Sequence, residues 1–199
     1  MKITTFVLGL LSNNTYIVEN EEDKTCFVVD PSTESVKLTN YIDGNKLKVE
    51  GVLLTHGHFD HVGGAAHLQS MYDAKIYMHK MDIEFIDNPL DIGRSYTRFD
   101  VDVTVDDGDE ISLCGQKIKV VHTPGHSQGG VCYVCDDVIF CGDTIFKDGY
   151  GRYDLRGGDF GALQNSIQKI FDLQGDYILL CGHGPSTTLN YERAHNEIF

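Results

Sequence analysis

The sequence predicts an α+β fold in which two mixed β-sheets pack face to face and helices cover both outer faces. One observation is the order of the expected elements: a series of strands followed by helices occurs twice along the 199 residues, so two sheets can bury one face each against the other. A second is the composition, because 41% apolar and 23% charged residues allow a sizeable core. The sequence has no internal repeat and no Pro/Gly/Ser-rich linker, and we expect residues 1–199 to form a single domain.

The first half of the chain is expected to open with three strands, because β-branched and aromatic runs are separated by polar turns such as Ser12-Asn13-Asn14. A short helix follows Pro31 and is closed by Asp43-Gly44. The segment Val52-Leu53-Leu54 predicts a buried strand, and the polar residues directly after it lie where functional sites of layered α/β proteins form. The expected elements are strands at 3–10, 15–18 and 25–29, a helix at 32–40, a strand at 52–54, a helix at 61–72, a strand at 75–78 and a helix at 80–86.

The second half is expected to begin with β-hairpins, because short apolar runs alternate with turn sequences such as Asp106-Asp107-Gly108 and Cys114-Gly115. A helix follows in which Phe160, Leu163 and Ile167 recur at helical spacing. A last buried strand and a helix come after it. The expected elements are strands at 101–105, 110–113, 116–121, 130–134 and 138–140, a helix at 160–171, a strand at 177–180 and a helix at 188–197.

The charge balance is strongly acidic, because 16 Lys and Arg face 30 Asp and Glu, for a net charge of -14. Such a surface repels phosphate backbones, so we expect no nucleic-acid partner. No apolar run reaches the roughly 20 residues of a membrane-spanning helix, and the first residues lack the pattern of a signal peptide. Six cysteines are too sparse for a disulfide scaffold, and Cys132 and Cys135 are expected as unpaired thiols on opposite faces of one strand. These features predict a cytoplasmic protein with no membrane partner.

The segment Thr55-His56-Gly57-His58-Phe59-Asp60-His61 places three imidazoles and one carboxylate directly after a buried strand. A single histidine in this position is typical of a structural, hydrogen-bonded residue. Three imidazoles in H-x-H-x-D-H spacing repel one another when protonated, and a cation that binds the neutral rings removes this repulsion. The segment therefore indicates metal ligation.

Three further residues of ligand type follow other expected strands. His126 follows the strand at 116–121, Asp143 follows the strand at 138–140, and His183 follows the strand at 177–180. Glycines beside these residues permit a tight backbone. The repeated pattern of a strand that ends in a ligand-type residue predicts that all four segments meet at one metal site.

The chain resembles the metallo-β-lactamase superfamily, whose signature is H-x-H-x-D-H followed by distant His, Asp and His ligands, and the match extends over essentially the whole chain. Its glyoxalase II branch is most similar, because the third His lies in T-P-G-H-S at 123–127 and the Asp in G-D-T-x-F at 142–146. True β-lactamases carry Cys at the position of Asp143. The resemblance implies that the first metal is held by His56, His58 and His126, the second by Asp60, His61 and His183, and that Asp143 bridges the two.

The resemblance also implies an αββα sandwich and a hydrolase with two divalent metal ions. Zinc is the expected metal, with iron or manganese as alternatives, because His and Asp ligands accept all three. In this family two ions share a bridging hydroxide and polarise an acyl carbonyl. Asp60 is the expected catalytic residue, because it can both bind the second ion and accept a hydrogen bond from that hydroxide. The substrate implied is a small-molecule thioester such as S-D-lactoylglutathione.

The loop after Asp143 contains Gly149-Tyr150-Gly151-Arg152, which resembles the family's loop with a basic residue that binds the glycine carboxylate of glutathione. The alternative is that Arg152 and Arg156 pair with Asp154 and Asp159 on an acidic surface. Typical glyoxalase II enzymes continue into a helical domain that binds glutathione, whereas this sequence ends at residue 199. It therefore resembles the short single-domain members, for which a different thiol carrier is an alternative.

Two other functions remain open from the sequence. One is a persulfide dioxygenase, a relative on the same fold that uses one iron, although a complete set of seven ligand residues favours two metals and hydrolysis. The other is a metal-binding module without catalysis, which the glycine-rich loop beside the ligands disfavours. Four histidines outside the motif are assigned structural or surface roles: His67, His79, His122 and His195. The oligomeric state is left open.

Overall fold

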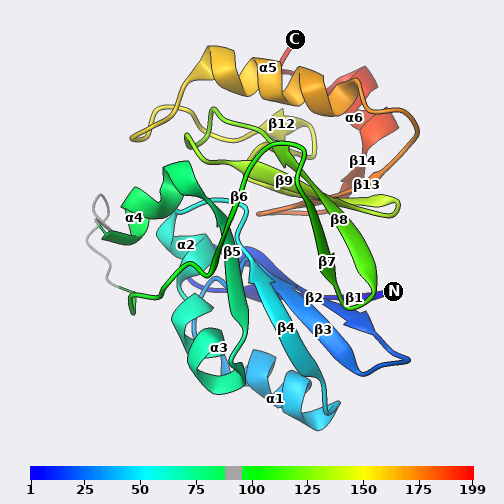
Figure 1. The fold of residues 1–199 in the computed structure, drawn as a ribbon. Helices are drawn as coiled ribbons and strands as arrows, with labels where there is room; N and C mark the ends of the chain where they lie inside the picture. Colours follow the sequence, from blue (N-terminus) through cyan, green and yellow to red (C-terminus); the bar gives the residue numbers. More distant parts are fainter. Residues whose placement is uncertain (88–95) are drawn as a thin grey trace.

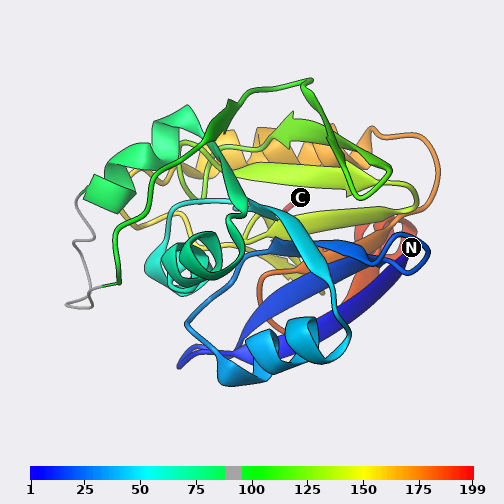
Figure 2. The ribbon, with the colours of Figure 1, turned by 60° about the horizontal axis from the view of Figure 1, so that its bottom comes forward.

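The computed structural model describes residues 1–87 and 96–199 and shows two six-stranded sheets packed face to face. Helices α1 and α3 cover the outer face of one sheet, and α5 and α6 cover the outer face of the other (Figure 1). Figure 2 shows the same order of layers from a second direction. The predicted α+β class and αββα arrangement are confirmed.

The first sheet has the strand order β1-β2-β3-β4-β5-β6. Its first three strands pair antiparallel, and β3 to β6 pair parallel. Because parallel strands end at the same edge, the loops after β3 and β4 meet there. The bounds are β1 Lys2–Leu8, β2 Asn13–Asn20, β3 Thr25–Val29, β4 Lys48–Leu53, β5 Lys75–His79 and β6 Val103–Val105.

The second sheet has the order β14-β13-β10-β9-β8-β7. The strands β7 to β10 form consecutive antiparallel hairpins, β10 and β13 pair parallel, and β13 and β14 pair antiparallel. A separate hairpin of β11 and β12 follows the end of β10. The bounds are β7 Glu110–Leu113, β8 Gln116–His122, β9 Val131–Cys135, β10 Val138–Gly142, β11 Ile145–Phe146, β12 Gly149–Tyr150, β13 Ile178–Cys181 and β14 Thr187–Thr188.

The helices within residues 1–87 and 96–199 are short, and the longest of them is α5 with 12 residues. Asp159 caps its N-terminus, because the Asp159 side chain accepts a hydrogen bond from the Ala162 N–H, and one face of the helix is apolar. The bounds are α1 Val36–Gly44, α2 Phe59–Val62, α3 Ala65–Tyr72, the 3-10 helix η1 Lys80–Asp82, α4 Ile83–Asp87, α5 Phe160–Phe171 and α6 Leu189–His195. No helix in the described ranges has the length and apolar composition needed to cross a membrane.

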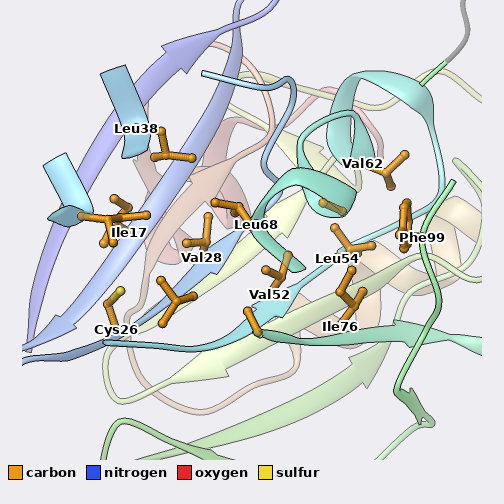
Figure 3. Packing of buried hydrophobic residues seen from close by; sticks show 14 of the residues in the cluster. Ile17, Cys26, Val28, Leu38, Val52, Leu54, Val62, Leu68, Ile76 and Phe99 are labelled. Atoms are coloured by element: carbon orange, nitrogen blue, oxygen red, sulfur yellow. The ribbon is translucent and has the colours of Figure 1, made fainter. Parts of the chain in front are cut away.

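Three apolar layers stabilise the sandwich. Between the first sheet and its helices, Leu38 of α1 and Leu68 of α3 pack on Val28 and Val52 (Figure 3). The layer between the sheets contains Tyr16, Phe27, Tyr133 and Phe140, among other residues. A third layer packs α5 against β8, β9, β10 and β13. These layers hold the two sheets together, and the loops at their edges are available to form a site.

Several predicted elements need correction. The strand expected at 101–105 does not start the run of hairpins, because β6 pairs parallel with β5 in the first sheet. The Asp102 side chain accepts from the Ile76 N–H, which fixes this segment beside β5. The helix expected at 61–72 is interrupted at Gly63 and Gly64, since glycine disfavours a helix interior. The helix expected at 32–40 starts only at Val36, because the Ser35 hydroxyl caps it there.

Candidate metal centre

The seven predicted ligand residues lie within four segments that each follow a strand. Four of them lie in the segment that runs from the end of β4 into the short helix α2, and the other three follow β8, β10 and β13. Parallel pairing of β10 with β13 brings Asp143 next to His183, and the Asn14 N–H donates to the Gly182 carbonyl, which joins the two sheets here. The structure thus brings all seven side chains together: His56, His58, Asp60, His61, His126, Asp143 and His183.

His56, His58 and His126 form the first group. Each offers a ring nitrogen, and these nitrogens all lie within 4.8 Å of one another. His58 Nδ1 is 2.8 Å from His126 Nε2. His56 Nε2 is buried and has no hydrogen-bond partner within residues 1–87 and 96–199. Two ring nitrogens at this distance need a proton or a cation between them, and the unpartnered nitrogen points to a cation.

Asp60, His61 and His183 form the second group, also with ligand atoms within 4.8 Å. Asp60 Oδ2 lies 3.2 Å from His183 Nε2 and 3.7 Å from His61 Nε2. His61 is completely buried, and His183 lies nearer the surface. This group combines two imidazoles with a carboxylate, a ligand set that suits zinc and iron.

Asp143 lies between the two groups. Its Oδ1 is 3.3 Å from His61 Nε2, and its Oδ2 is 3.6 Å from both His126 Nε2 and His183 Nε2. In the part of the chain that the structure describes, buried Oδ1 has no hydrogen-bond partner. One carboxylate that faces histidines of both groups has the placement a bridging ligand needs.

The electrostatics of the two groups differ. Burial lowers the pKa of His58 to about 3, and the neighbouring His126 and His61 contribute in the same direction. Burial also lowers the pKa of His61, but the Asp143 and Asp30 carboxylates outweigh it and raise that pKa well above the ordinary value. Burial raises the pKa of Asp143, but His61, His126 and His183 outweigh it and hold that pKa far below its usual range. Burial therefore disfavours the protonated forms of His56 and His58, whereas the pKa values of His61 and His183 are raised by neighbouring carboxylates.

In three of these histidines, a hydrogen bond to ring nitrogen Nδ1 fixes the orientation of the ring. His61 Nδ1 lies 2.9 Å from Asp30 Oδ2, and His126 Nδ1 donates to the Arg152 carbonyl at 2.7 Å. His183 Nδ1 donates to the Leu11 carbonyl at 3.1 Å. In His126 and His183, Nε2 faces the other ligand residues, which is the arrangement found around protein metal sites, whereas His61 Nε2 also lies 2.9 Å from Asn13 Nδ2. The donor set and its orientation fit divalent cations.

Sequence reasoning did not identify Asp30, which is buried and central to the site. Its Oδ1 accepts from the Thr55 N–H at 2.8 Å, and its Oδ2 accepts from the Thr55 hydroxyl at 2.6 Å. The Thr55 hydroxyl lies 3.0 Å from His56 Nδ1, so Asp30 also supports the first group. The signal was present, because Asp30 directly follows the apolar strand β3 just as the predicted ligands follow theirs.

The remaining predicted residues lie around the site. The side chain of Arg152 is 60% exposed and pairs with Asp154 at 2.8 Å, while its main-chain carbonyl holds His126. Arg156 pairs with Glu84 instead of Asp159, since the Asp159 side chain caps α5. The four histidines assigned structural or surface roles lie outside both ligand groups, and two of them, His79 and His122, stack at 4.3 Å. All six cysteines are buried and unpaired, as expected.

A cavity of about 380 Å³ opens beside Asp60. Its walls include the rings of Phe59 and Tyr96 and the side chain of Leu10, which is 78% exposed. Ser32 and Glu34 supply polar groups. A cavity of this size and mixed character suits one arm of a small-molecule substrate.

Comparisons with known proteins agree with this geometry. The sequence profile of the metallo-beta-lactamase superfamily matches residues 8–183. The probable metallo-hydrolase YqgX of Bacillus subtilis is 31% identical over 98% of this chain and 96% of its own. The hydroxyacylglutathione hydrolase of Shewanella baltica is 33% identical over 92% of this chain and 65% of its own.

Two solved structures are also similar over nearly the full length. The B3 metallo-beta-lactamase BLEG-1 has a TM-score of 0.93 and 32% identity, with 98% of each chain covered. TTHA1623 in a di-iron-bound form has a TM-score of 0.87 and 33% identity, with 98% of this chain and 100% of that chain covered. The chain therefore belongs to the metallo-beta-lactamase superfamily, and its relatives indicate a metal-dependent hydrolase.

Proposed function

We propose that this protein hydrolyses a small-molecule thioester, such as S-D-lactoylglutathione or the ester of a related thiol carrier. The observation that carries the proposal is the position of Asp143 between two histidine-containing ligand groups. The similarity to a hydroxyacylglutathione hydrolase supports the choice of a thioester.

Two divalent ions are proposed, one for each ligand group. His56, His58 and His126 would hold the first, Asp60, His61 and His183 would hold the second, and Asp143 would be shared. Such ions, when bound, lower the pKa of water and polarise a carbonyl oxygen. Zinc is the proposed metal, with iron or manganese as alternatives, and the di-iron form of TTHA1623 supports iron among them.

Asp60 is proposed as the catalytic residue of the chain. The His183 and His61 side chains hold the pKa of its carboxyl below the usual value, although burial opposes this shift. Asp60 therefore stays ionised at neutral pH and accepts a hydrogen bond from the attacking water. Its place in the lining of the 380 Å³ cavity would allow it to fix the direction of attack on the acyl carbon.

Substrate binding is proposed to involve the cavity beside Asp60 and the side chain of Arg152. Arg152 already binds the Asp154 carboxylate through two nitrogens, at 2.8 Å each. A carboxylate on the thiol carrier would take the place of Asp154 in the same geometry. A cytoplasmic location is part of the proposal, because six unpaired cysteines suit a reducing compartment.

The test is turnover by protein loaded separately with zinc, iron and manganese. We expect hydrolysis of S-D-lactoylglutathione, with release of a free thiol, by at least one metal form. Oxygen uptake with a persulfide and no thioester hydrolysis would favour a dioxygenase instead. Hydrolysis of a β-lactam alone would contradict the proposal and favour the activity named for BLEG-1.

A further inference from the structure

A second carboxylate, Asp82, is completely buried behind the metal centre and was not among the predicted site residues. It is the last residue of η1, just before α4, and α4 lies at the same end of the sandwich as α2 (Figure 1). Asp82 is no metal ligand in either group. Burying a carboxylate costs free energy unless several hydrogen-bond donors surround it. The donors around Asp82 therefore identify the segments that it positions.

Asp82 accepts three hydrogen bonds, all from the two segments that carry the first ligand group. The Gly57 N–H donates to Oδ2 at 2.9 Å, and the Ser127 hydroxyl donates to the same oxygen at 2.7 Å. The Gly129 N–H donates to Oδ1. Gly57 lies between His56 and His58, and Ser127 directly follows His126. One side chain therefore ties together all three ligands of the first group.

The packing around these hydrogen bonds leaves no room for a side chain at positions 57 and 129. A Cβ on Gly57 would lie 2.8 Å from the main-chain oxygen of Asp82, and a Cβ on Gly129 would lie 2.7 Å from its carboxyl carbon. Both distances are shorter than a normal van der Waals contact. The two glycines therefore allow the main chain of both ligand segments to approach Asp82.

The second ligand group is supported by other residues. His61 is oriented by Asp30, and His183 by the Leu11 carbonyl. Asp30 reaches the first group as well, through Thr55 and His56. Asp82 thus differs from Asp30, because its hydrogen bonds reach the residues beside the ligands of the first group, whereas those of Asp30 support both groups.

We propose that Asp82 is a positioning residue that sets the affinity of the first metal ion and leaves that of the second unchanged. The proposal rests on the two-ion site proposed above. Substituting residues that orient metal ligands weakens metal binding by about 10- to 100-fold, because the ligands must then be ordered at the moment of binding. Asp82→Asn keeps the volume of the side chain but turns an N–H group toward one of the three donors.

The experiment measures zinc dissociation constants by competition with a chelator in two backgrounds. His183→Ala disables the second group and leaves the first ion to be measured. In this background we expect Asp82→Asn to raise the zinc dissociation constant by about 10- to 100-fold. His58→Ala disables the first group and leaves the second ion, for which we expect a change within about twofold. Asp30→Asn is the matched control and should raise the zinc dissociation constant in both backgrounds.

Two further measurements separate positioning from folding. The Co²⁺ absorption spectrum of Asp82→Asn in the His183→Ala background should change, and in the His58→Ala background it should not. If Asp82→Asn fails to fold, Ser127→Ala removes one of the three donors and should show the same asymmetry at reduced size. An equal loss of affinity for both ions, or no loss of affinity for the first ion, would overturn the proposal. These measurements need no turnover, so a protein that binds zinc asymmetrically but cleaves no thioester would refute only the proposed function.

Discussion

Asp30 Oδ2 lies 2.9 Å from His61 Nδ1, and both side chains are buried. This contact turns His61 Nε2 toward Asp143, at 3.3 Å. The same carboxylate oxygen accepts from the Thr55 hydroxyl, which lies beside His56. One carboxylate thus determines which nitrogen each of two histidines presents to the metal centre, and they belong to different groups.

Asp30→Ala should destabilise the protein even without metal. It leaves a buried imidazole and a buried main-chain N–H without their acceptor, and breaking a buried ionic pair in this way costs about 3 to 5 kcal/mol. Urea unfolding of metal-free wild type and variant measures the difference. Thr55→Val is the control, since it removes one hydroxyl and keeps the Asp30–His61 contact. A loss below about 1 kcal/mol would show that the contact contributes little.

Asp143→Ala should bind close to one metal equivalent less than wild type and lose almost all activity. The reason is that Asp143 faces histidines of both groups, so its removal affects both ions at once. A bound metal ion stabilises the transition state by several kcal/mol, so we expect kcat to fall by about 1,000-fold or more when this stabilisation is lost. Metal analysis after dialysis and steady-state kinetics measure the two effects. Full metal content with full turnover would refute the bridging role.

Acidification should release the second ion before the first. Metal ligation requires an unprotonated ring. Burial lowers the pKa of His58 to about 3, so no proton has to leave it near neutral pH. The pKa values of His61 and His183 are raised by neighbouring carboxylates, which outweigh burial. Binding of the second ion therefore displaces protons, and its apparent affinity falls as the pH falls.

Chelator competition between pH 6 and pH 8 tests this difference. For each proton displaced, the affinity of the second ion should fall by up to about tenfold per pH unit below the raised pKa. The first ion, measured in the His183→Ala background, should show the shallower slope. Equal slopes for the two ions would contradict the assignment of charge to the two groups.

The sequence singled out the candidate ligand residues, which the structure brings together, but it did not single out the residues that orient them. Three histidines and an aspartate within six positions form a local pattern that packing does not produce, so the segment 56–61 was recognisable. Asp30 and Asp82 are single carboxylates, and only the contacts made in the folded chain distinguish them from surface residues. The pairing of β6 was mispredicted for the same reason, because its partner β5 is fixed by the Asp102–Ile76 contact across the sheet edge.

Arg152→Ala should raise KM for a carboxylated thioester by roughly tenfold to hundredfold and change kcat little, since one charge-assisted contact is lost in ground and transition states alike. The substitution keeps the main-chain carbonyl that accepts from His126, so the metal centre is preserved. Arg156→Ala is the matched control, because Arg156 lies on the same loop and pairs with Glu84. A thioester without the carboxylate should be cleaved equally by wild type and by Arg152→Ala. If the variant matches wild type on the carboxylated substrate as well, the contact of Arg152 with Asp154 is a surface ion pair, and the thiol carrier binds through the cavity beside Asp60 alone.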